Sequence, residues 1–480
     1  MKRTYRIILA VLTLVLALSL VLAGCSSQEN GAVYVVSIAQ TDGSGEESEF
    51  TVTYSDGTTS TFTVKNGKDG EDGAVSAADL YEEYKEIYGD DLTYEQFLEK
   101  YLTVSVPEDN SATIAKTLLS CVRVYTEFTT TTLSGGWGGM QQTKGVSVST
   151  GAGVVYQMDE DYTYFVTNYH VVYNENANAD NGSNIARKIA VYAYGSQTSP
   201  YNSGEKGSDG YDVIEYGSDA ILCDYVGGAA SLDIAILRAD TDDVLNVNED
   251  MCAVTLADGY SVGETAIAVG NPEDEGMSVT EGIVSVDSEY VTLSVDGTSR
   301  QYRSMRIDTA LYEGNSGGGV FNEDGELIGL ANAGDGSDQN VNYAIPVSIV
   351  KGGADNIIYN SQNGGTSGVT RPTLGVTVSI ASSKYVYDEE TASGKITETL
   401  EVSAVTEGSI AEKMGLAVGD EVLAFVINGT EHEIDRSFQI GDLLLTLRAG
   451  DKISSKIRQS GQETETSEYE ILSSDLVSVE

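Results

Sequence analysis

The stretch Glu313-Gly-Asn-Ser-Gly-Gly-Gly-Val320 decides how we interpret the fold of this sequence. A glycine-rich turn around one serine is often only a flexible loop. The glycine two positions before Ser316 has a second use, because it lets the backbone turn the N–H groups of Gly314 and Ser316 towards one point, with Asn315 between them. A Cβ atom at position 314 would obstruct that turn. The stretch is therefore typical of a site where backbone donors face a developing negative charge.

Two other segments complete the pattern. The apolar run of residues 164–166 leads to His170, and Asp233 stands at the entry of the apolar run 234–237. Alone, a histidine beside apolar residues is more often a packed ring, and an aspartate before a strand is usually a turn or cap residue. Attack of a hydroxyl on an amide carbonyl, however, needs a base for the hydroxyl proton and an anion that orients the base. The chain order His-Asp-Ser is the one found in chymotrypsin-type enzymes.

Composition excludes several classes of function. The 480 residues include 27 Lys and Arg against 74 Asp and Glu, a net charge of −47, while 41% are hydrophobic. That apolar content is enough to bury real cores, and a surface this acidic repels nucleic acid. The abundance of Gly, Ser, Thr and Tyr favours a mostly β structure with many turns. The only histidines are His170 and His432, and the trio 431–433 offers too few ligands for a metal. Covalent catalysis by a serine needs neither a metal nor an organic cofactor, so we predict none.

The N-terminus has the pattern of an export signal. A basic start at residues 2–6 precedes an apolar run at 7–22, and residues 22–25 read Leu-Ala-Gly-Cys, which resembles a bacterial lipobox. We therefore predict that residues 1–24 are a lipoprotein signal peptide and that Cys25 is lipidated. The body of the protein would then be extracytoplasmic, lipid-anchored to the outer face of the bacterial cell membrane. The alternative is an uncleaved anchor helix, for which the apolar run is slightly short.

Sequence patterns divide the remainder of the chain. Residues 50–54 and 61–64 alternate around a Ser-Asp-Gly turn and predict a hairpin, and capping-box spacing predicts short helices after residue 76. Later, short apolar runs separated by Gly, Asp and Asn are typical of an antiparallel barrel or sandwich. The predicted segments are an acidic linker with a β-hairpin at 25–75, a short helical segment at 76–111, a β domain at 112–351, a polar glycine-rich linker at 352–370 and a last unit at 371–480.

Seven motifs in the right order resemble the HtrA/Deg (DegP-like) branch of the trypsin-like serine proteases. They include the three segments above and residues 269–272, 279–285, 307–310 and 343–346, so that the resemblance covers about residues 112–476. It implies a mostly β, chymotrypsin-like double β-barrel with the active site between the barrels. It also implies an extracytoplasmic serine endopeptidase that acts on misfolded or exposed proteins, and a homotrimer.

The resemblance assigns roles to individual residues. His170 would be the general base, Asp233 would orient it, and Ser316 would be the nucleophile, with an oxyanion hole built from Gly314, Asn315 and Ser316. The chain departs from the family at Glu313, where proline is common, and near residues 195–219, which look like a surface insertion. No acid is evident at the pocket base, so a preference for small or medium apolar residues is implied. The expected pocket walls are Leu311, Leu330, Ala331, Asn332, Asn342 and Tyr343.

The last unit resembles the PDZ domain of the same family, on residues 371–376, 408–416 and 418–423. Such a domain binds an extended peptide as an added strand, so Leu374, Gly375 and Val376 are expected to capture a C-terminal carboxylate. A buried strand without a ligand is the alternative.

Two other functions stay open at this point. One is a weakly active or inactive chaperone or scaffold, and the other is a surface-interaction lipoprotein that uses the PDZ groove. Glu313 is the only residue that supports a loss of activity. Cys121, Cys223 and Cys252 are expected to be free thiols, although one disulfide among them is also open.

Overall fold

A computed structural model describes residues 35–42, 47–54, 57–65, 81, 85, 93, 110–136, 139–177, 184–335, 338–365, 367–388 and 393–479. The chain divides into two compact units, Met1–Pro107 and Glu108–Glu480. The predicted signal peptide 1–24, Cys25 and nearly all of the predicted helical segment 76–111 lie outside the described residues. No helix in the described part of the chain is both long and apolar enough to span a membrane.

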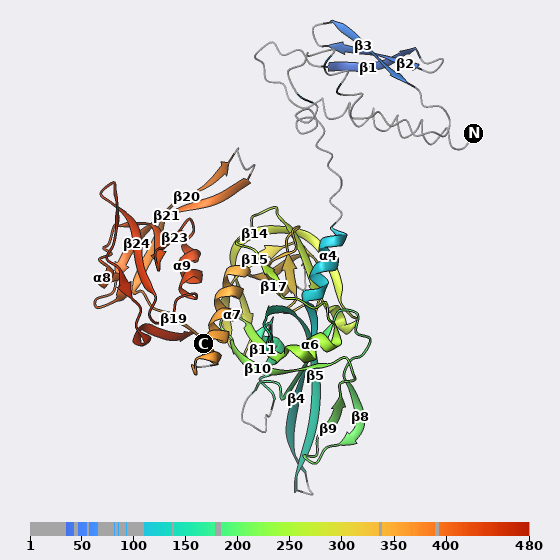
Figure 1. The fold of residues 1–480 in the computed structure, drawn as a ribbon, viewed down its shortest axis with the longest axis vertical. Coiled ribbons are helices and arrows are strands. Elements are labelled where there is room, and N and C mark those ends of the chain that lie inside the picture. Colours follow the sequence, from blue (N-terminus) through green and yellow to red (C-terminus); the bar gives the residue numbers. More distant parts are fainter. Residues whose placement is uncertain are drawn as a thin grey trace, which may run out of the picture. The chain divides into compact units, whose positions relative to one another are not determined.

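The described part of the first unit is a small antiparallel sheet of β1 (Val35–Asp42), β2 (Glu47–Tyr54) and β3 (Thr59–Lys65) (Figure 1). Strands β2 and β3 pair from Glu47↔Lys65 to Thr53↔Thr59, which confirms the predicted hairpin. Gly57, with φ +82°, lies in the turn between them, where glycine is the residue that adopts this backbone without strain. Strand β1 adds a third strand that the sequence did not predict.

The second unit begins with a closed antiparallel barrel, in which the strands follow the order β10-β11-β6-β5-β4-β7. Alternate side chains on these strands, such as Val122 and Val124 on β4 and Phe165 on β6, fill the barrel interior. Its elements are α4 (Ser111–Thr117), η1 (Leu118–Ser120), β4 (Cys121–Gly136), β5 (Gly139–Met158), β6 (Tyr162–Thr167), α5 (Tyr169–Val172), β7 (Lys188–Ala193), β10 (Ile221–Ala229), β11 (Ile234–Asp240) and α6 (Thr241–Val247).

A second ring of strands follows, because β17 pairs with both β16 and β18 and so closes the path β16-β13-β14-β15-β18-β17. The mostly β, double-barrel fold is therefore confirmed. The elements are β12 (Thr255–Leu256), β13 (Thr265–Gly270), η2 (Pro272–Asp274), β14 (Ser278–Ser294), β15 (Ser299–Ile307), β16 (Gly319–Phe321), β17 (Glu326–Asp335) and β18 (Asp338–Pro346).

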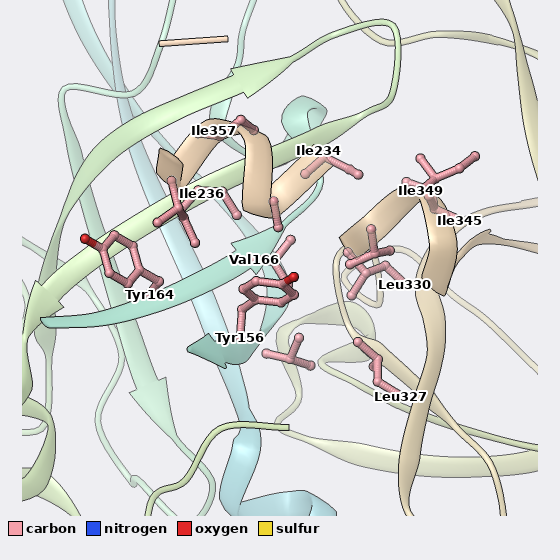
Figure 2. Packing of buried hydrophobic residues seen from close by; sticks show 14 of the residues in the cluster. Tyr156, Tyr164, Val166, Ile234, Ile236, Leu327, Leu330, Ile345, Ile349 and Ile357 are labelled. Carbon is pink, nitrogen blue, oxygen red and sulfur yellow. The ribbon is translucent and has the colours of Figure 1, made fainter. Parts of the chain in front are cut away.

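The predicted linker at 352–370 is wrong for most of its length, because helix α7 (Val347–Gln362) occupies it. Ile357 of this helix packs beside Ile234 and Ile236 of β11 in a core that joins both barrels (Figure 2). The glycine that suggested flexibility instead permits close packing, since a Cβ atom at Gly352 would lie 2.7 Å from Cβ of Leu445.

The polar residues of α7 are likewise part of the packing. Asn356 is buried; its side-chain N–H donates to the carbonyl of Leu445 at 3.1 Å, and its Oδ1 accepts from the N–H of Thr370 at 3.0 Å. These bonds satisfy an amide that would be costly to bury alone. Composition suggested a linker, but the polar and small residues serve tertiary contacts.

The C-terminal part is α+β, with its own core around Leu374, Val402 and Phe425. Helix α8 begins at the N-cap Ser409, whose hydroxyl accepts from the N–H of Glu412 at 3.2 Å, and its buried face includes Met414. Its elements are β19 (Val369–Pro372), β20 (Val376–Asp388), β21 (Ser393–Val405), α8 (Ile410–Met414), β22 (Glu421–Ile427), β23 (Thr430–Glu433), α9 (Ser437–Leu444), β24 (Lys452–Gln459), β25 (Gln462–Glu465), β26 (Tyr469–Glu470), η3 (Ser473–Asp475) and β27 (Leu476–Val479).

The expected insertion at 195–219 forms a hairpin of β8 (Tyr201–Lys206) and β9 (Asp212–Glu215). Apolar side chains around it, including Ile214 and Tyr216, pack on Tyr192 of the first barrel. The hydroxyl of Tyr216 also donates to the buried carboxylate of Glu127 at 2.5 Å. The expected surface insertion is therefore anchored to the barrel.

The three cysteines of the second unit, Cys121, Cys223 and Cys252, are free thiols, which confirms that expectation. Burial raises the pKa of the Cys121 and Cys223 thiols, so both stay protonated near neutral pH.

Candidate active site

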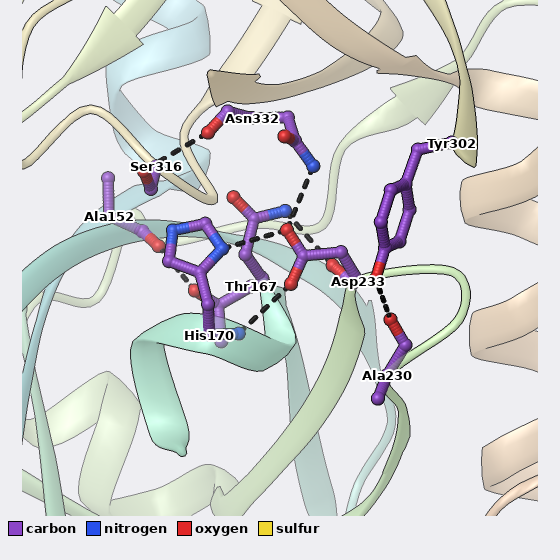
Figure 3. Close-up of polar contacts among 9 residues, drawn as sticks. Ala152, Thr167, His170, Ala230, Asp233, Tyr302, Ser316 and Asn332 are labelled. Atoms are coloured by element: carbon purple, nitrogen blue, oxygen red, sulfur yellow. Dashed lines mark hydrogen bonds and ion pairs between the residues drawn. The ribbon is translucent and has the colours of Figure 1, made fainter. Parts of the chain in front are cut away.

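Pairing of β6 with β11 brings a histidine and an aspartate together. Thr167, the last residue of β6, lies opposite Ala235 near the start of β11, so His170 just after one strand meets Asp233 just before the other. Nδ1 of His170 lies 2.8 Å from Oδ2 of Asp233, and the backbone N–H of His170 donates to Oδ1 at 2.9 Å (Figure 3). The carboxylate thus fixes both the ring and the backbone of the histidine, and Nε2 remains as the free ring nitrogen.

Asp233 is fully buried, with 0% of its side chain exposed. Besides His170, it is held by Asn332, whose side-chain N–H donates to Oδ2 at 2.8 Å, and by Asn168, whose side-chain N–H donates to the Asp233 carbonyl at 3.0 Å. Its φ of +54° lies in the left-handed region, which is uncommon for any residue but glycine. Such a strained backbone persists only where surrounding contacts hold it, and strained residues are concentrated at functional sites.

The electrostatic setting favours a charged His170. Burial disfavours the imidazolium and lowers the pKa, but the charge of Asp233 and its hydrogen bond outweigh burial, so the pKa of His170 is raised above its ordinary 6.5. With 32% of its side chain exposed, the ring is still accessible from one side. The arrangement stabilises a histidine that receives a proton from a neighbouring hydroxyl.

Ser316 comes from the second barrel and reaches the same site. The imidazole of His170 lies between Ser316 and Asp233 in Figure 3. Among the described residues, the hydroxyl of Ser316 donates to the carbonyl of Asn332, at a long 3.4 Å, and no bond to His170 is formed. Catalytic hydrogen bonds are often long in ligand-free structures and tighten when substrate binds, so this geometry does not exclude the serine.

The turn before Ser316 presents its backbone donors selectively. The N–H of Asn315 donates to Tyr312 O at 3.0 Å and that of Gly317 to Ala331 O at 2.9 Å. Within the described part of the chain, the N–H groups of Gly314 and Ser316 have no protein acceptor. These are the two groups expected to form an oxyanion hole.

The neighbouring loop holds this turn in place. The N–H of Glu273 donates to the carbonyl of Glu313 at 2.7 Å, and because the peptide is trans, the N–H of Gly314 points the opposite way. Gly314 has φ +97°, and a Cβ atom there would overlap the carbonyl oxygen of Asn271. The positive φ and the close approach of Asn271 therefore both require glycine at 314. The unusual Glu313 accepts a hydrogen bond through its backbone carbonyl, while its side chain is exposed.

Several expected pocket residues have other environments. The side chains of Leu330 and Ala331 are buried in hydrophobic cores, and Asn332 bonds to Asp233 and Ser316 instead of lining a pocket. Asn342 is buried, and its side-chain N–H donates to the carbonyl of Thr309 at 2.9 Å. Leu311 and Tyr343 are half-buried and stay the better candidates for a pocket wall.

The expected peptide-binding loop precedes an edge strand, β20, which pairs with β21 on one side only. The carbonyls of Leu374 and Gly375 accept from Ala411 and Thr406 at 2.9 and 2.8 Å. Gly375 has φ +71°, and a Cβ atom there would overlap Ser409. Leu374 itself is buried in the core of this part, so Val376 is the residue of the three that can face a ligand.

The chain is similar in sequence to known proteins. The family of trypsin-like peptidase domains matches residues 151–330. The serine protease Do-like HtrA of Bacillus subtilis (strain 168) is 26% identical over 65% of this chain and 62% of its own length. That of Lactococcus lactis subsp. lactis (strain IL1403) is 28% identical over 60% of this chain and 63% of its own. The solved HtrA-type protease AlgW with a tripeptide aligns over 76% of this chain and 96% of its own at 24% identity, with a TM-score of 0.43.

Fold, site and family match together define a chain that carries a trypsin-like peptidase domain. Within that class, the chain is similar in sequence to HtrA-type serine proteases, the group to which both of these relatives are assigned by name. It spans about three fifths of the length of the Bacillus and Lactococcus relatives, at 62% and 63%.

Proposed function

We propose that the protein is an extracytoplasmic serine endopeptidase of HtrA/Deg type, with His170, Asp233 and Ser316 as its catalytic triad. The observation that carries the proposal is the buried Asp233, which bonds both Nδ1 and the backbone N–H of His170 at 2.8 and 2.9 Å beside the Ser316 turn. A histidine that is merely packed in a core does not need an oriented carboxylate with two bonds to it.

The chemistry follows from these positions. Nε2 of His170 takes the proton of the Ser316 hydroxyl as Oγ attacks the peptide carbonyl, and Asp233 stabilises the imidazolium that results. The unpaired N–H groups of Gly314 and Ser316 donate to the oxyanion of the tetrahedral intermediate. His170 then gives its proton to the leaving amine, and water releases the acyl group from Ser316 by the same route. No metal or organic cofactor enters any of these steps.

Substrates would be unfolded or exposed proteins. The C-terminal part would act as a PDZ domain, in which a substrate's C-terminal segment adds a strand to the free edge of β20. One relative is named a probable periplasmic endoprotease, and this name, together with the lipobox-like sequence before Cys25, supports an extracytoplasmic, lipid-anchored location. A homotrimer is part of the same proposal.

The test is covalent labelling of the full chain with a fluorophosphonate, which reacts with an activated serine. We expect the wild type to be labelled and Ser316→Ala to lose the label, because the modified oxygen is Oγ of Ser316. The exposed Ser261→Ala, in a turn before β13, is the matched control and should be labelled like the wild type. Labelling of Ser316→Ala at the wild-type rate would contradict the triad.

The alternative is a chain without protease activity. One observation favours it, the bond from the Ser316 hydroxyl to the Asn332 carbonyl instead of to His170. A folded wild type that is not labelled, even with peptide substrate present, would point to a chaperone, scaffold or surface-interaction lipoprotein. Peptide binding at the β20 edge would then be the activity to measure.

A further inference from the structure

The turn that delivers Asp233 to His170 is short and strained. It runs from Ala229 to Asp233, where the N–H of Leu232 donates to the Ala229 carbonyl at 3.2 Å and that of Asp233 to the Ala230 carbonyl at 3.3 Å. Both bonds are longer than usual. Asp233 ends the turn with φ +54°, a backbone that a non-glycine residue keeps only where its surroundings hold it.

Little within the turn itself can hold that conformation. The hydroxyl of Ser231 is buried without a hydrogen-bond partner in the described part of the chain, so the polar side chain of the turn gives it no support. The carbonyl of Ala230 therefore has a central place, because it accepts the N–H that closes the turn on Asp233.

A tyrosine from the second barrel reaches this carbonyl. The hydroxyl of Tyr302, on β15, donates to the carbonyl of Ala230 at 2.8 Å, which is shorter than the turn's own bond to the same oxygen (Figure 3). Tyr302 is only 3% exposed, and its place opposite Val291 in the β14–β15 ladder fixes its backbone. Burial raises its pKa, so the hydroxyl keeps the proton that it donates.

We propose that Tyr302 is a positioning residue of the active site: its hydroxyl holds the carbonyl of Ala230, so that Asp233 keeps its left-handed backbone and presents both carboxylate oxygens to His170. The inference rests on the proposed protease function for its catalytic consequence. Its structural part does not, because the contacts between Asp233 and His170 exist whether or not the enzyme turns over.

Both carboxylate oxygens of Asp233 must be placed at once. Asp233 Oδ1 accepts the backbone N–H of His170 and Oδ2 accepts from both His170 and Asn332. A rotation of the Asp233 backbone out of the left-handed region would move both oxygens, and Asn332 holds only one of them. Without the Tyr302 bond, the Ala230 carbonyl is held only by the 3.3 Å bond from the Asp233 N–H, and the turn can relax towards an ordinary backbone.

The test compares Tyr302→Phe with the matched control Tyr192→Phe. Tyr192 is also a fully buried tyrosine whose hydroxyl donates to a backbone carbonyl, that of Tyr216 at 2.6 Å, but it belongs to the insertion contact in the first barrel. Both changes remove one buried hydroxyl and leave the ring in place. Both variants are studied at temperatures where thermal unfolding shows them to be folded.

The main readout is the titration of His170 by NMR. The chain has only two histidines, so His432 serves as an internal reference in the same spectra. Asp233 is the charged group that acts on His170, and Arg300, Asp233 and Asp296 are the charged groups that act on Tyr302. We expect Tyr302→Phe to lower the pKa of His170 towards its ordinary value, because Asp233 is less well aligned, while His432 is unchanged and Tyr192→Phe moves neither.

Peptide hydrolysis is the second readout. In Tyr302→Phe, kcat should fall about tenfold with KM nearly constant, because misalignment affects the reacting groups and not the substrate contacts. If Tyr302→Phe matches Tyr192→Phe in both the His170 titration and kcat, the proposal is wrong. If the wild type hydrolyses nothing, the titration still decides the positioning role, and only the protease function fails.

Discussion

Substitution of alanine for Gly314 tests the geometry of the oxyanion turn most directly. The new Cβ atom would overlap the carbonyl oxygen of Asn271, and φ at this position is +97°. The turn can relieve the overlap only by moving away from the 271–273 loop, which breaks the bond from the Glu273 N–H to the Glu313 carbonyl. The N–H of Gly314 then no longer points to the place where the oxyanion forms.

The expected magnitude follows from losing one of two donors. Removal of one oxyanion-hole donor costs about 10²–10³ in kcat, or roughly 3–4 kcal/mol of transition-state stabilisation. The left-handed backbone adds about 1–2 kcal/mol of strain, which affects the free energy of unfolding. Gly263 has φ +93°, and a Cβ atom added there would have no neighbour within 4 Å, so Gly263→Ala shares the strain but not the overlap.

The assay measures kcat and KM on a peptide substrate, together with thermal unfolding of both variants. We expect Gly263→Ala to lose stability through backbone strain alone and to keep kcat. Gly314→Ala should lose kcat by the factor given above and lose more stability than Gly263→Ala, because it adds the overlap with Asn271 to the same strain. A kcat for Gly314→Ala within about threefold of the wild type would refute the assignment, because such a turn would not depend on the position of the Gly314 N–H.

Two further predictions concern the base and the core. Asp233→Asn should lower kcat by about 10⁴ and move the acid limb of the kcat/KM profile to lower pH, because Asp233 raises the pKa of His170. A raised histidine pKa stabilises the fold at pH values below the pKa of the unfolded state, and this stabilisation is lost as the pH rises through the pKa of the folded state. The difference in unfolding free energy between wild type and variant should therefore be largest below pH ~6.5 and shrink at higher pH. Leu445→Ala should cost about 2–5 kcal/mol in chemical denaturation, because Leu445 is 3% exposed in the core shared with α7, whereas Leu472→Ala, 50% exposed, should change stability by less than about 0.5 kcal/mol.

Much of the fold could be predicted because its signals are local. The alternation that predicted the first hairpin depends only on neighbouring residues, and β2 and β3 follow it. The barrels were expected from short apolar runs between turns, and strands such as β11 begin where those runs begin. The residues at the ends of these strands, His170 and Asp233, could be named in advance because the chemistry of acyl transfer restricts which residue types can serve.

The remainder depended on contacts that no local pattern encodes. In α7, the buried Val350, Ala354 and Ile357 have helical spacing, but nearby glycine and asparagine residues gave the segment the composition of a linker. Asn332 looked like a pocket wall, yet it bonds to Asp233, which lies 99 residues earlier in the chain. The role of Tyr302 is equally long-range, because its partner Ala230 is 72 residues away.

The glycines of the site have a common reason that only the joined barrels reveal. In the proposed mechanism, the first barrel supplies the base and its carboxylate and the second supplies the nucleophile, so the two must approach closely for proton transfer. The N–H of Ala152 donates to the carbonyl of Ser316 at 2.9 Å, which ties β5 directly to the backbone of the nucleophile. A Cβ atom at Gly317 would overlap the Ala152 carbonyl, and one at Gly151 would lie 3.2 Å from the Ser316 carbonyl. The glycine-rich turn is therefore not a flexible loop, since its lack of side chains is what allows a rigid contact between the two halves of the site.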